Sequence, residues 1–320
     1  GFPLLPNGQP QKTVTFDCSE LGQQNVELWS IDLAGNADFC LTYVIVQDNM
    51  MNCNASHATV AGALKTETGN GLEDASVALE GSVPPVSMTA VTNAGGEFSL
   101  ATVPTPGNYT VTPMKDNDPL NGVSTFDLVL INKHILGLEP LNTPYKMIAA
   151  DANNSRSITT FDIVELRKLI LGIYTELPNN TSWRFVDNAF AFPNQSNPFQ
   201  TIFPETKQIA NLTVDQLAEN FVAVKVGDVN GNAVTSSLMN ADDRTAGTLL
   251  FDVEDRTVKA GETFTVHFKA AEQVQGYQFT VNHAGLELVD VTPVTEGMSM
   301  GNFGVFAQEQ AVTTSWDGDV

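Results

Sequence analysis

Two acidic, amide-rich loops in this chain each run into nearly the same apolar segment. Residues 125–137 (TFDLVLINKHILG) return as residues 160–172 (TFDIVELRKLILG), 35 residues further along. An Asp- and Asn-containing stretch precedes each copy, beginning at Asp116 in one and at Asp151 in the other. Oxygen-bearing side chains at alternating positions ahead of a helix are typical of calcium loops, since Ca²⁺ takes roughly six to eight oxygen ligands. The sequence therefore predicts cation binding in two related units.

The second loop has the fuller ligand set. A twelve-residue calcium loop supplies oxygens from positions 1, 3, 5, 7, 9 and 12, position 7 through its backbone carbonyl. Counted from Asp151, these positions hold Asp151, Asn153, Ser155, Ser157, Thr159 and Asp162. Position 6, which favours a glycine with positive φ, holds Arg156 instead. We expect Ca²⁺ here in spite of that departure.

The first loop is poorer in ligands. Its candidate oxygens come from Asp116, Asp118, Gly122 (through its carbonyl), Ser124 and Asp127. Position 5 holds Leu120, which cannot ligate, so we expect a weaker site or one completed by water and backbone oxygens. The alternative for both loops is a set of ordinary turns and helix caps, where Asp, Asn, Ser and Thr are common.

Each loop must be held by the helix that follows it. Phe126, Val129 and Leu130 follow helical spacing in the first copy, and Ile163, Leu166 and Ile170 do so in the second. Gly137 and Gly172 suit the C-terminal caps of these helices. Two such units are expected to pack as a pair over one shared apolar face.

This duplicated loop-plus-helix pattern resembles the type I dockerin family, over roughly residues 115–175. The matching loop positions are Asp116, Asp118, Asp127, Asp151, Asn153, Ser155 and Asp162. The resemblance implies an EF-hand-like module whose helices bind a cohesin domain. The implied partner-binding residues are Thr125, Phe126 and Lys133 in one copy and Thr160, Phe161 and Lys168 in the other.

A long insert departs from the dockerin pattern. It runs from residue 179 to about residue 226 and ends in the sequence GDVNGN. Asp228, Asn230 and Asn232 stand there at alternating positions, which suits half of a calcium loop. These residues either fold back to complete a calcium shell or form a plain turn. With this insert, the predicted dockerin-like module covers residues 116–235.

The flanking segments predict β-structure. Residues 55–115 contain short strands split by Gly- and Asn-rich turns, and they resemble the collagen-adhesin B-type and carboxypeptidase-regulatory-like repeats of surface proteins. The segment Val60-Ala61-Gly62 and residues 71–77 and 92–98 carry that resemblance. Residues 245–320 alternate in strand fashion and resemble the front half of a cohesin-like jelly roll. The predicted fold class is thus mainly β, with tandem β-sandwich modules and a helical, EF-hand-like module between them.

Residues 1–54 hold all three cysteines, Cys18, Cys40 and Cys53. A hairpin is expected there, with its turn at Gly35-Asn36, and the segment resembles the end of a hyalin-repeat-like, immunoglobulin-type domain. Cysteines confined to a short β-module suggest an oxidising compartment. We expect a disulfide between Cys18 and Cys40. We also expect the chain to begin and end inside β-domains of a longer protein.

Composition excludes several classes of function. The 37 acidic residues outnumber the 15 basic ones, for a net charge of −22, whereas nucleic-acid binders need clustered Lys and Arg. No run of apolar residues is long enough for a membrane span. The four histidines are scattered, and no hydrolase or phosphate-loop motif is present. We therefore expect a protein that is not an enzyme.

The leading hypothesis is a structural or adhesive protein, secreted to a bacterial cell surface in the manner of type IX-secreted proteins. Its partner would be a second copy or a cohesin-like domain, in a calcium-stabilised stalk, filament or other homo-oligomer. One alternative is the C-terminal anchoring region of a secreted polysaccharide hydrolase or protease. Another is a carbohydrate-binding surface protein that takes a polysaccharide on exposed aromatic residues.

Overall fold

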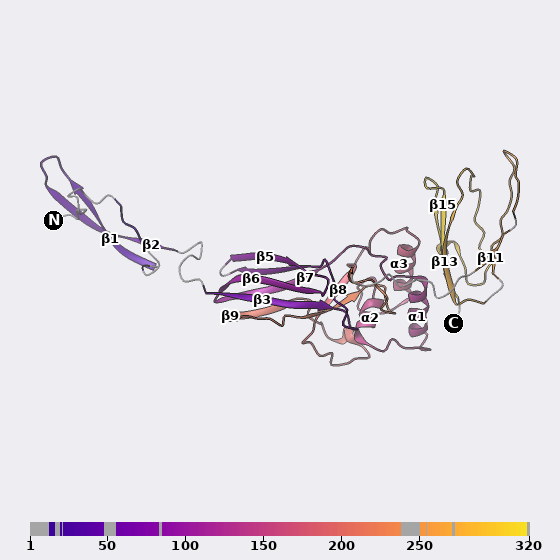
Figure 1. Ribbon diagram of the computed structural model, residues 1–320, viewed down its shortest axis with the longest axis horizontal. Helices are drawn as coiled ribbons and strands as arrows, with labels where there is room; N and C mark the ends of the chain where they lie inside the picture. The colour runs from indigo at the N-terminus through magenta and orange to yellow at the C-terminus, as the bar shows by residue number, and fades with distance from the viewer. Residues whose placement is uncertain are drawn as a thin grey trace.

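The computed structural model describes residues 13–16, 20, 22–47, 56–82, 85–237, 250–253, 255–270 and 273–318. Within these ranges the chain is mainly β, with several sheets and three α-helices (Figure 1). Over residues 56–318 the sandwich strands come first, the helices lie next to them, and the C-terminal sheet lies beyond the helices. The longest helices have 11 residues, and none in the described part is long and apolar enough to cross a membrane.

The N-terminal described segment is the expected hairpin of β1 (Gly22–Ile31) and β2 (Ala37–Val46), paired antiparallel. Gly35 has φ +87° in the turn, and the Asp32 carboxylate accepts the backbone N–H groups of Ala34 and Asn36. Cys40 is exposed on β2, whereas Cys18 and Cys53 lie outside the described residues. The Cys18–Cys40 disulfide therefore stays a prediction.

The central β-sandwich draws strands from two separated parts of the sequence. One sheet has the order β6 (Glu97–Thr105), β3 (Ser56–Lys65), β10 (Phe221–Lys225), β8 (Trp183–Asp187). The other has the order β5 (Pro85–Val91), β4 (Ser76–Ser82), β7 (Gly107–Met114), β9 (Lys207–Leu212). The insert thus adds β8, β9 and β10 to the sandwich predicted for residues 55–115, so the two predicted modules share strands.

The inward residues of the alternating strands form the sandwich core, and side chains from the insert complete it. Val77 and Leu79 of β4 are buried, for example, against Trp183, Ile209 and Phe221. The insert also approaches the backbone of β3 closely. A Cβ atom on Gly62 would lie only 2.1 Å from the carbonyl oxygen of Glu219, so only glycine fits this position.

The helices α1 (Thr125–Ile135), α2 (Pro144–Ala150) and α3 (Thr160–Ile170) form a second core with the insert. Leu128, Ile131, Leu166 and Leu169 are fully buried there. The prediction that Phe126 belongs to the buried face was wrong: its side chain is 46% exposed, and Leu128 and Ile131 point inward instead. Helical spacing fits more than one face of α1, and packing selected this one. Gly137 and Gly172 follow α1 and α3 with positive φ, as expected for C-terminal caps.

The C-terminal region contains β11 (Phe251–Asp252), β12 (Lys269–Ala270), β13 (Gly276–Asn282), β14 (Phe303–Phe306) and β15 (Ala311–Asp317). β15 lies between β13 and β14 and pairs antiparallel with both. Aromatic side chains pack over this sheet, notably Phe251, Phe268, Tyr277, Phe279 and Trp316.

Candidate metal centres and the docking face of the helices

The second loop is closed by its two end carboxylates. The Asp151 carboxylate accepts the N–H groups of Ser155 (2.8 Å) and Arg156 (2.9 Å). Asp162, at the start of α3, accepts the N–H of Asn153 (3.1 Å) on one oxygen and that of Thr159 (2.8 Å) on the other. These bonds close residues 151–162 into a compact loop.

Arg156 adopts the conformation that its loop position requires. Its φ is +64°, in the left-handed region that usually favours glycine at position 6. Its guanidinium donates to the backbone carbonyl of Phe199 in the insert, at 2.5 Å. The arginine thus keeps the sharp turn and also joins the loop to the insert.

Burial makes the Asp151 carboxylate of this loop electrostatically costly. Asp151 and Asp162 are both fully buried. Burial raises the pKa of Asp151, the nearby charge of Asp162 raises it further, and the backbone donors act in the opposite direction. Among the described residues, neither carboxylate forms an ion pair with Lys, Arg or His. A bound cation would supply the missing positive charge.

Around Asp127 the same arrangement is built from two separate segments. One oxygen of Asp127 accepts the N–H (2.9 Å) and the hydroxyl (2.9 Å) of Ser124, as Asp162 does from Thr159. The other oxygen accepts the N–H groups of Val229 (3.0 Å) and Asn230 (3.3 Å). In the second loop that donor is Asn153, so Asn230 stands at the corresponding position.

The correspondence extends through residues 228–233. Asp228 accepts the N–H groups of Asn232 and Ala233, as Asp151 does from Ser155 and Arg156. The side-chain oxygen of Asn230 accepts the N–H of Asn232 (3.0 Å), as that of Asn153 does from Ser155 (3.0 Å). Residues 228–233 thus take the place of the first half of a loop whose second half is residues 122–127. We call these two segments together the split loop.

Two contacts fasten the halves of the split loop together. The Asn121 side chain donates to the carbonyl of Val234 (2.7 Å) and accepts its N–H (2.9 Å). Gly122, with φ +75°, lies so close to Ala233 that a Cβ atom would come within 2.7 Å of the Ala233 Cα. This close approach brings Gly122, Ser124 and Asp127 to the half-loop that begins at Asp228.

Asp116 and Asp118, predicted as ligands in the first loop, are exposed. Asp116 accepts the N–H of Ser182 (2.7 Å), and Asp118 has a positive φ of +47°. Their role as metal ligands stays a prediction. The described hydrogen bonds of Asp127 go to Ser124, Val229 and Asn230 and not to these two residues.

A buried ammonium group, that of Lys225, links the segment before α1 to the segment after β10. Lys225 is 4% exposed and donates to the carbonyl oxygens of Pro119 (2.8 Å) and Val226 (2.9 Å). Burial lowers the pKa of Lys225 to about 8, opposed by the charges of Asp228, Asp118, Asp127 and Asp116, in that order. No local pattern in the sequence marks this residue, since a lysine at the end of a strand is ordinarily solvent-exposed.

The two carboxylates of the split loop repel each other. Burial raises the pKa of Asp127 to about 7, and the neighbouring charge of Asp228 contributes in the same direction. Burial likewise raises the pKa of Asp228, while the N–H donors of residues 231–233 lower it. Within the described ranges no group of three or more His, Cys, Asp or Glu side chains is arranged to hold a metal. Each loop instead offers two carboxylates together with amide, hydroxyl and carbonyl oxygens.

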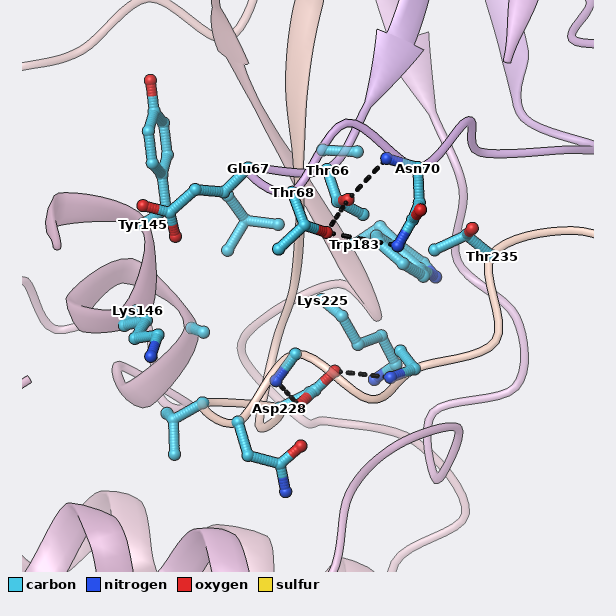
Figure 2. A pocket seen from close by; sticks show the side chains of 17 residues that line it. Thr66, Glu67, Thr68, Asn70, Tyr145, Lys146, Trp183, Lys225, Asp228 and Thr235 are labelled. Atoms are coloured by element: carbon cyan, nitrogen blue, oxygen red, sulfur yellow. Dashed lines mark hydrogen bonds between the residues drawn. The ribbon is translucent and has the colours of Figure 1, made fainter. Parts of the chain in front are cut away.

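A small cavity lies beside residues 228–233. Its volume is about 140 Å³, and Asp228, Lys225 and Trp183 line it together with the turn at residues 66–70 (Figure 2). Pockets for small molecules usually exceed about 300 Å³. The cavity is therefore too small to indicate a substrate site.

The start of α1 and the end of α3 both contact the C-terminal sheet. The N–H and hydroxyl of Thr125 donate to the side-chain oxygen of Gln278 (2.8 and 2.9 Å), and the hydroxyl also bonds that of Ser315 (2.8 Å). Arg167 forms an ion pair with Asp317. The hydroxyl of Thr313 donates to the carbonyl of Leu171 (2.7 Å). We call these contacts the docking face.

Of the six predicted partner-binding residues, Thr125 makes these described contacts. Phe126 and Phe161 are 46% and 73% exposed, and Thr160 is also exposed. Lys133 pairs with Glu139 (3.4 Å), and Lys168 donates to the hydroxyl of Tyr174 (3.1 Å). Sequence reasoning missed Arg167, Gln278, Ser315 and Asp317, because their pairing depends on how the C-terminal sheet lies against the helices.

Comparison with known proteins found little. No family model and no curated protein matches the chain. A solved structure of the pilus adhesin RrgA from Streptococcus pneumoniae aligns with 26% identity and a TM-score of 0.18. The alignment covers 22% of this chain and 8% of the adhesin.

Proposed function

We propose that this chain is a calcium-stabilised structural module of a secreted bacterial surface protein, with an adhesive or stalk-like role. Its helical part is EF-hand-like and similar to a dockerin, with one cation in the loop of residues 151–162 and a second in the split loop. The observation that carries the proposal is the repetition of one hydrogen-bond scheme, around Asp162 in a continuous loop and around Asp127 in a loop assembled from two segments.

The donor set suits a hard cation. Carboxylate, amide, hydroxyl and carbonyl oxygens favour Ca²⁺ or Mg²⁺ over the metals that bind imidazole or thiolate. Ca²⁺ accepts a flexible shell of oxygens, whereas Mg²⁺ demands near-octahedral geometry and retains several waters. Calcium is therefore the proposed ion, and Asp151, Asp162, Asp127 and Asp228 would hold it and neutralise their own buried charge.

A mechanical role follows from where the loops lie. The loop of residues 151–162 leads into α3, and the split loop joins α1 to the chain that leaves the β-sandwich after β10. Ions at these places would stiffen the connection between the sandwich, the helices and the C-terminal sheet. Such a connection suits an extracellular protein that is extended and bears load. Self-association, or binding to a cohesin-like domain, is part of the proposal.

The direct test is calcium titration of the chain by isothermal calorimetry, with magnesium titrated in parallel. We expect two calcium ions per chain and a rise in melting temperature with calcium, since an ion that binds the folded state stabilises it by mass action. The Asp162→Asn variant should retain one ion. No heat of binding, together with a melting temperature that is unchanged by chelator, would refute the proposal.

A further inference from the structure

The docking face begins inside the split loop. Thr125, the first residue of α1, lies between Ser124 and Asp127, and all three belong to one turn of chain. Thr125 is 4% exposed, and its partner Ser315 is fully buried. The first turn of α1 therefore has two sets of partners at once, residues 228–233 through Asp127 and the C-terminal sheet through Thr125.

The C-terminal sheet lies close to the first turn of α1. A Cβ atom on Gly276 would lie 3.1 Å from Cγ2 of Thr125 and 3.3 Å from Cγ2 of Val129. At the other end of the face, a Cβ atom on Gly304 would lie 3.0 Å from the carbonyl oxygen of Leu171. The sheet thus approaches the helices closely at two glycines, where a larger residue would be crowded.

Without a cation the split loop is under electrostatic tension. Asp127 and Asp228 are buried carboxylates on separate chain segments, and the backbone N–H donors and the nearby charge of Lys225 only partly compensate them. Separation of the segments would relieve the repulsion but would also release the first turn of α1. A cation bound by both segments would neutralise this repulsion and so favour the closed arrangement of the two segments.

We propose that the split loop controls the docking of the C-terminal sheet. An ion held between residues 228–233 and 122–127 fixes the first turn of α1. It thereby fixes the position of Thr125, which forms the hydrogen bonds with Gln278 and Ser315. This inference rests on the proposed calcium function and adds its consequence for the neighbouring module. The coupling is reciprocal, so docking strengthens ion binding in the split loop by the same factor.

The second loop provides a matched control within the same chain. Thr160 corresponds to Thr125 in the repeat, yet it is exposed, whereas the described contacts of α3 with the sheet come from its far end, at Arg167 and Leu171. Asp162, the last candidate ligand of the second loop, precedes Arg167 and Leu171 by about one and a half and two and a half helical turns. An ion in the second loop should therefore affect docking much less.

The backbone N–H of Thr125 is a direct probe of docking. The first N–H groups of a helix have no intrahelical acceptor, and that of Thr125 donates to Gln278. We would measure its hydrogen exchange by NMR in the full chain, with calcium and with chelator, in wild type, Asp228→Asn and Asp162→Asn. Chelator and Asp228→Asn should each speed exchange at least about fivefold, the lower end of typical coupling, whereas Asp162→Asn in calcium should change it less than twofold.

A second measurement reads the coupling in the opposite direction and leaves the metal ligands intact. Thr125→Val removes the hydroxyl that bonds Gln278 and Ser315, and Thr160→Val is its matched control. Calcium affinity at one of the two sites should fall about fivefold in Thr125→Val and stay unchanged in Thr160→Val. If calcium binds normally but neither measurement differs from its control, the inference fails and the proposed function stands. If no calcium binds, both fail.

Discussion

Asp127 accepts the backbone N–H of Val229 at 3.0 Å, across 102 residues of sequence. This bond joins the first turn of α1 to the segment that follows β10, after the chain has passed through α2, α3 and three strands of the sandwich. It closes a loop whose two halves are distant in sequence. The order of the candidate ligands along the chain is therefore different from their order around the split loop.

From the hydrogen bonds of the split loop we predict that Asp228, and not Asp116, binds calcium. Asp228→Asn should lower the number of bound calcium ions from two to one, because Asp228 takes the place in the split loop that Asp151 has in the second loop. Asp116→Asn, its control, should keep two ions and stay close to wild type in stability, because the side-chain oxygen of asparagine still accepts the N–H of Ser182. Calorimetric stoichiometry decides. Loss of an ion from Asp116→Asn alone would instead support a continuous first loop.

Stability without metal should fall as the pH rises from about 4 to about 7. The pKa of Asp127 is raised from 3.8 to about 7, so the native state binds more protons than the unfolded chain in this window. The shift corresponds to at most about 4 kcal/mol of unfolding free energy. Urea unfolding in chelator at pH 4.5 and 7.0 measures it. Saturating calcium should reduce or reverse the slope, since the ion binds the deprotonated carboxylates.

The Asp127→Asn variant is the control for this pH dependence. Asparagine keeps the size of the side chain but does not titrate, so the slope in chelator should become clearly shallower, with the raised pKa values of Asp151 and Asp228 leaving a remainder of the same sign. A slope equal to that of wild type would show that Asp127 does not cause it.

Lys225→Met should destabilise the chain by about 2–4 kcal/mol. Methionine matches the length of the stem but leaves the carbonyl oxygens of Pro119 and Val226 without their donor. An unsatisfied buried group costs roughly 1–3 kcal/mol, and the Pro119 bond is only partly buried, so its share is smaller. Lys65→Met removes an exposed charge from β3 and should change stability by less than about 0.5 kcal/mol. Equal unfolding free energies for the two variants would contradict a structural role for the Lys225 ammonium.

Gly62→Ala tests whether the insert is part of the β-sandwich. The added Cβ would collide with the carbonyl of Glu219, and overpacking of this kind typically costs about 1–3 kcal/mol or more. Gly301→Ala places a Cβ no closer than 3.4 Å to its nearest neighbour and serves as control. Thermal unfolding of both variants measures the difference. A Gly62→Ala variant as stable as Gly301→Ala would mean that residue 219 does not approach β3.

The sequence alone determined the features that depend on neighbouring residues. The repeat, the helices that begin at Thr125 and Thr160, and the hairpin turn at Gly35 follow from local spacing and turn chemistry, and the structure has them. The order of the candidate ligands in the second loop is also local, because all of them lie within residues 151–162. The missing ligand at Leu120 already indicated that the first loop was incomplete, and the alternating Asp and Asn residues after Gly227 offered a completion.

Only the tertiary structure decided which of these fragments meet. Spacing along the chain places Asp116 and Asp118 next to Asp127, but the fold brings Asp228 and Asn230 there through the pairing of β10 with β3 and β8. The burial of Lys225 and the approach of Gln278 to Thr125 have the same origin. Contacts between distant segments depend on how the shared core closes, and no local pattern encodes that closure.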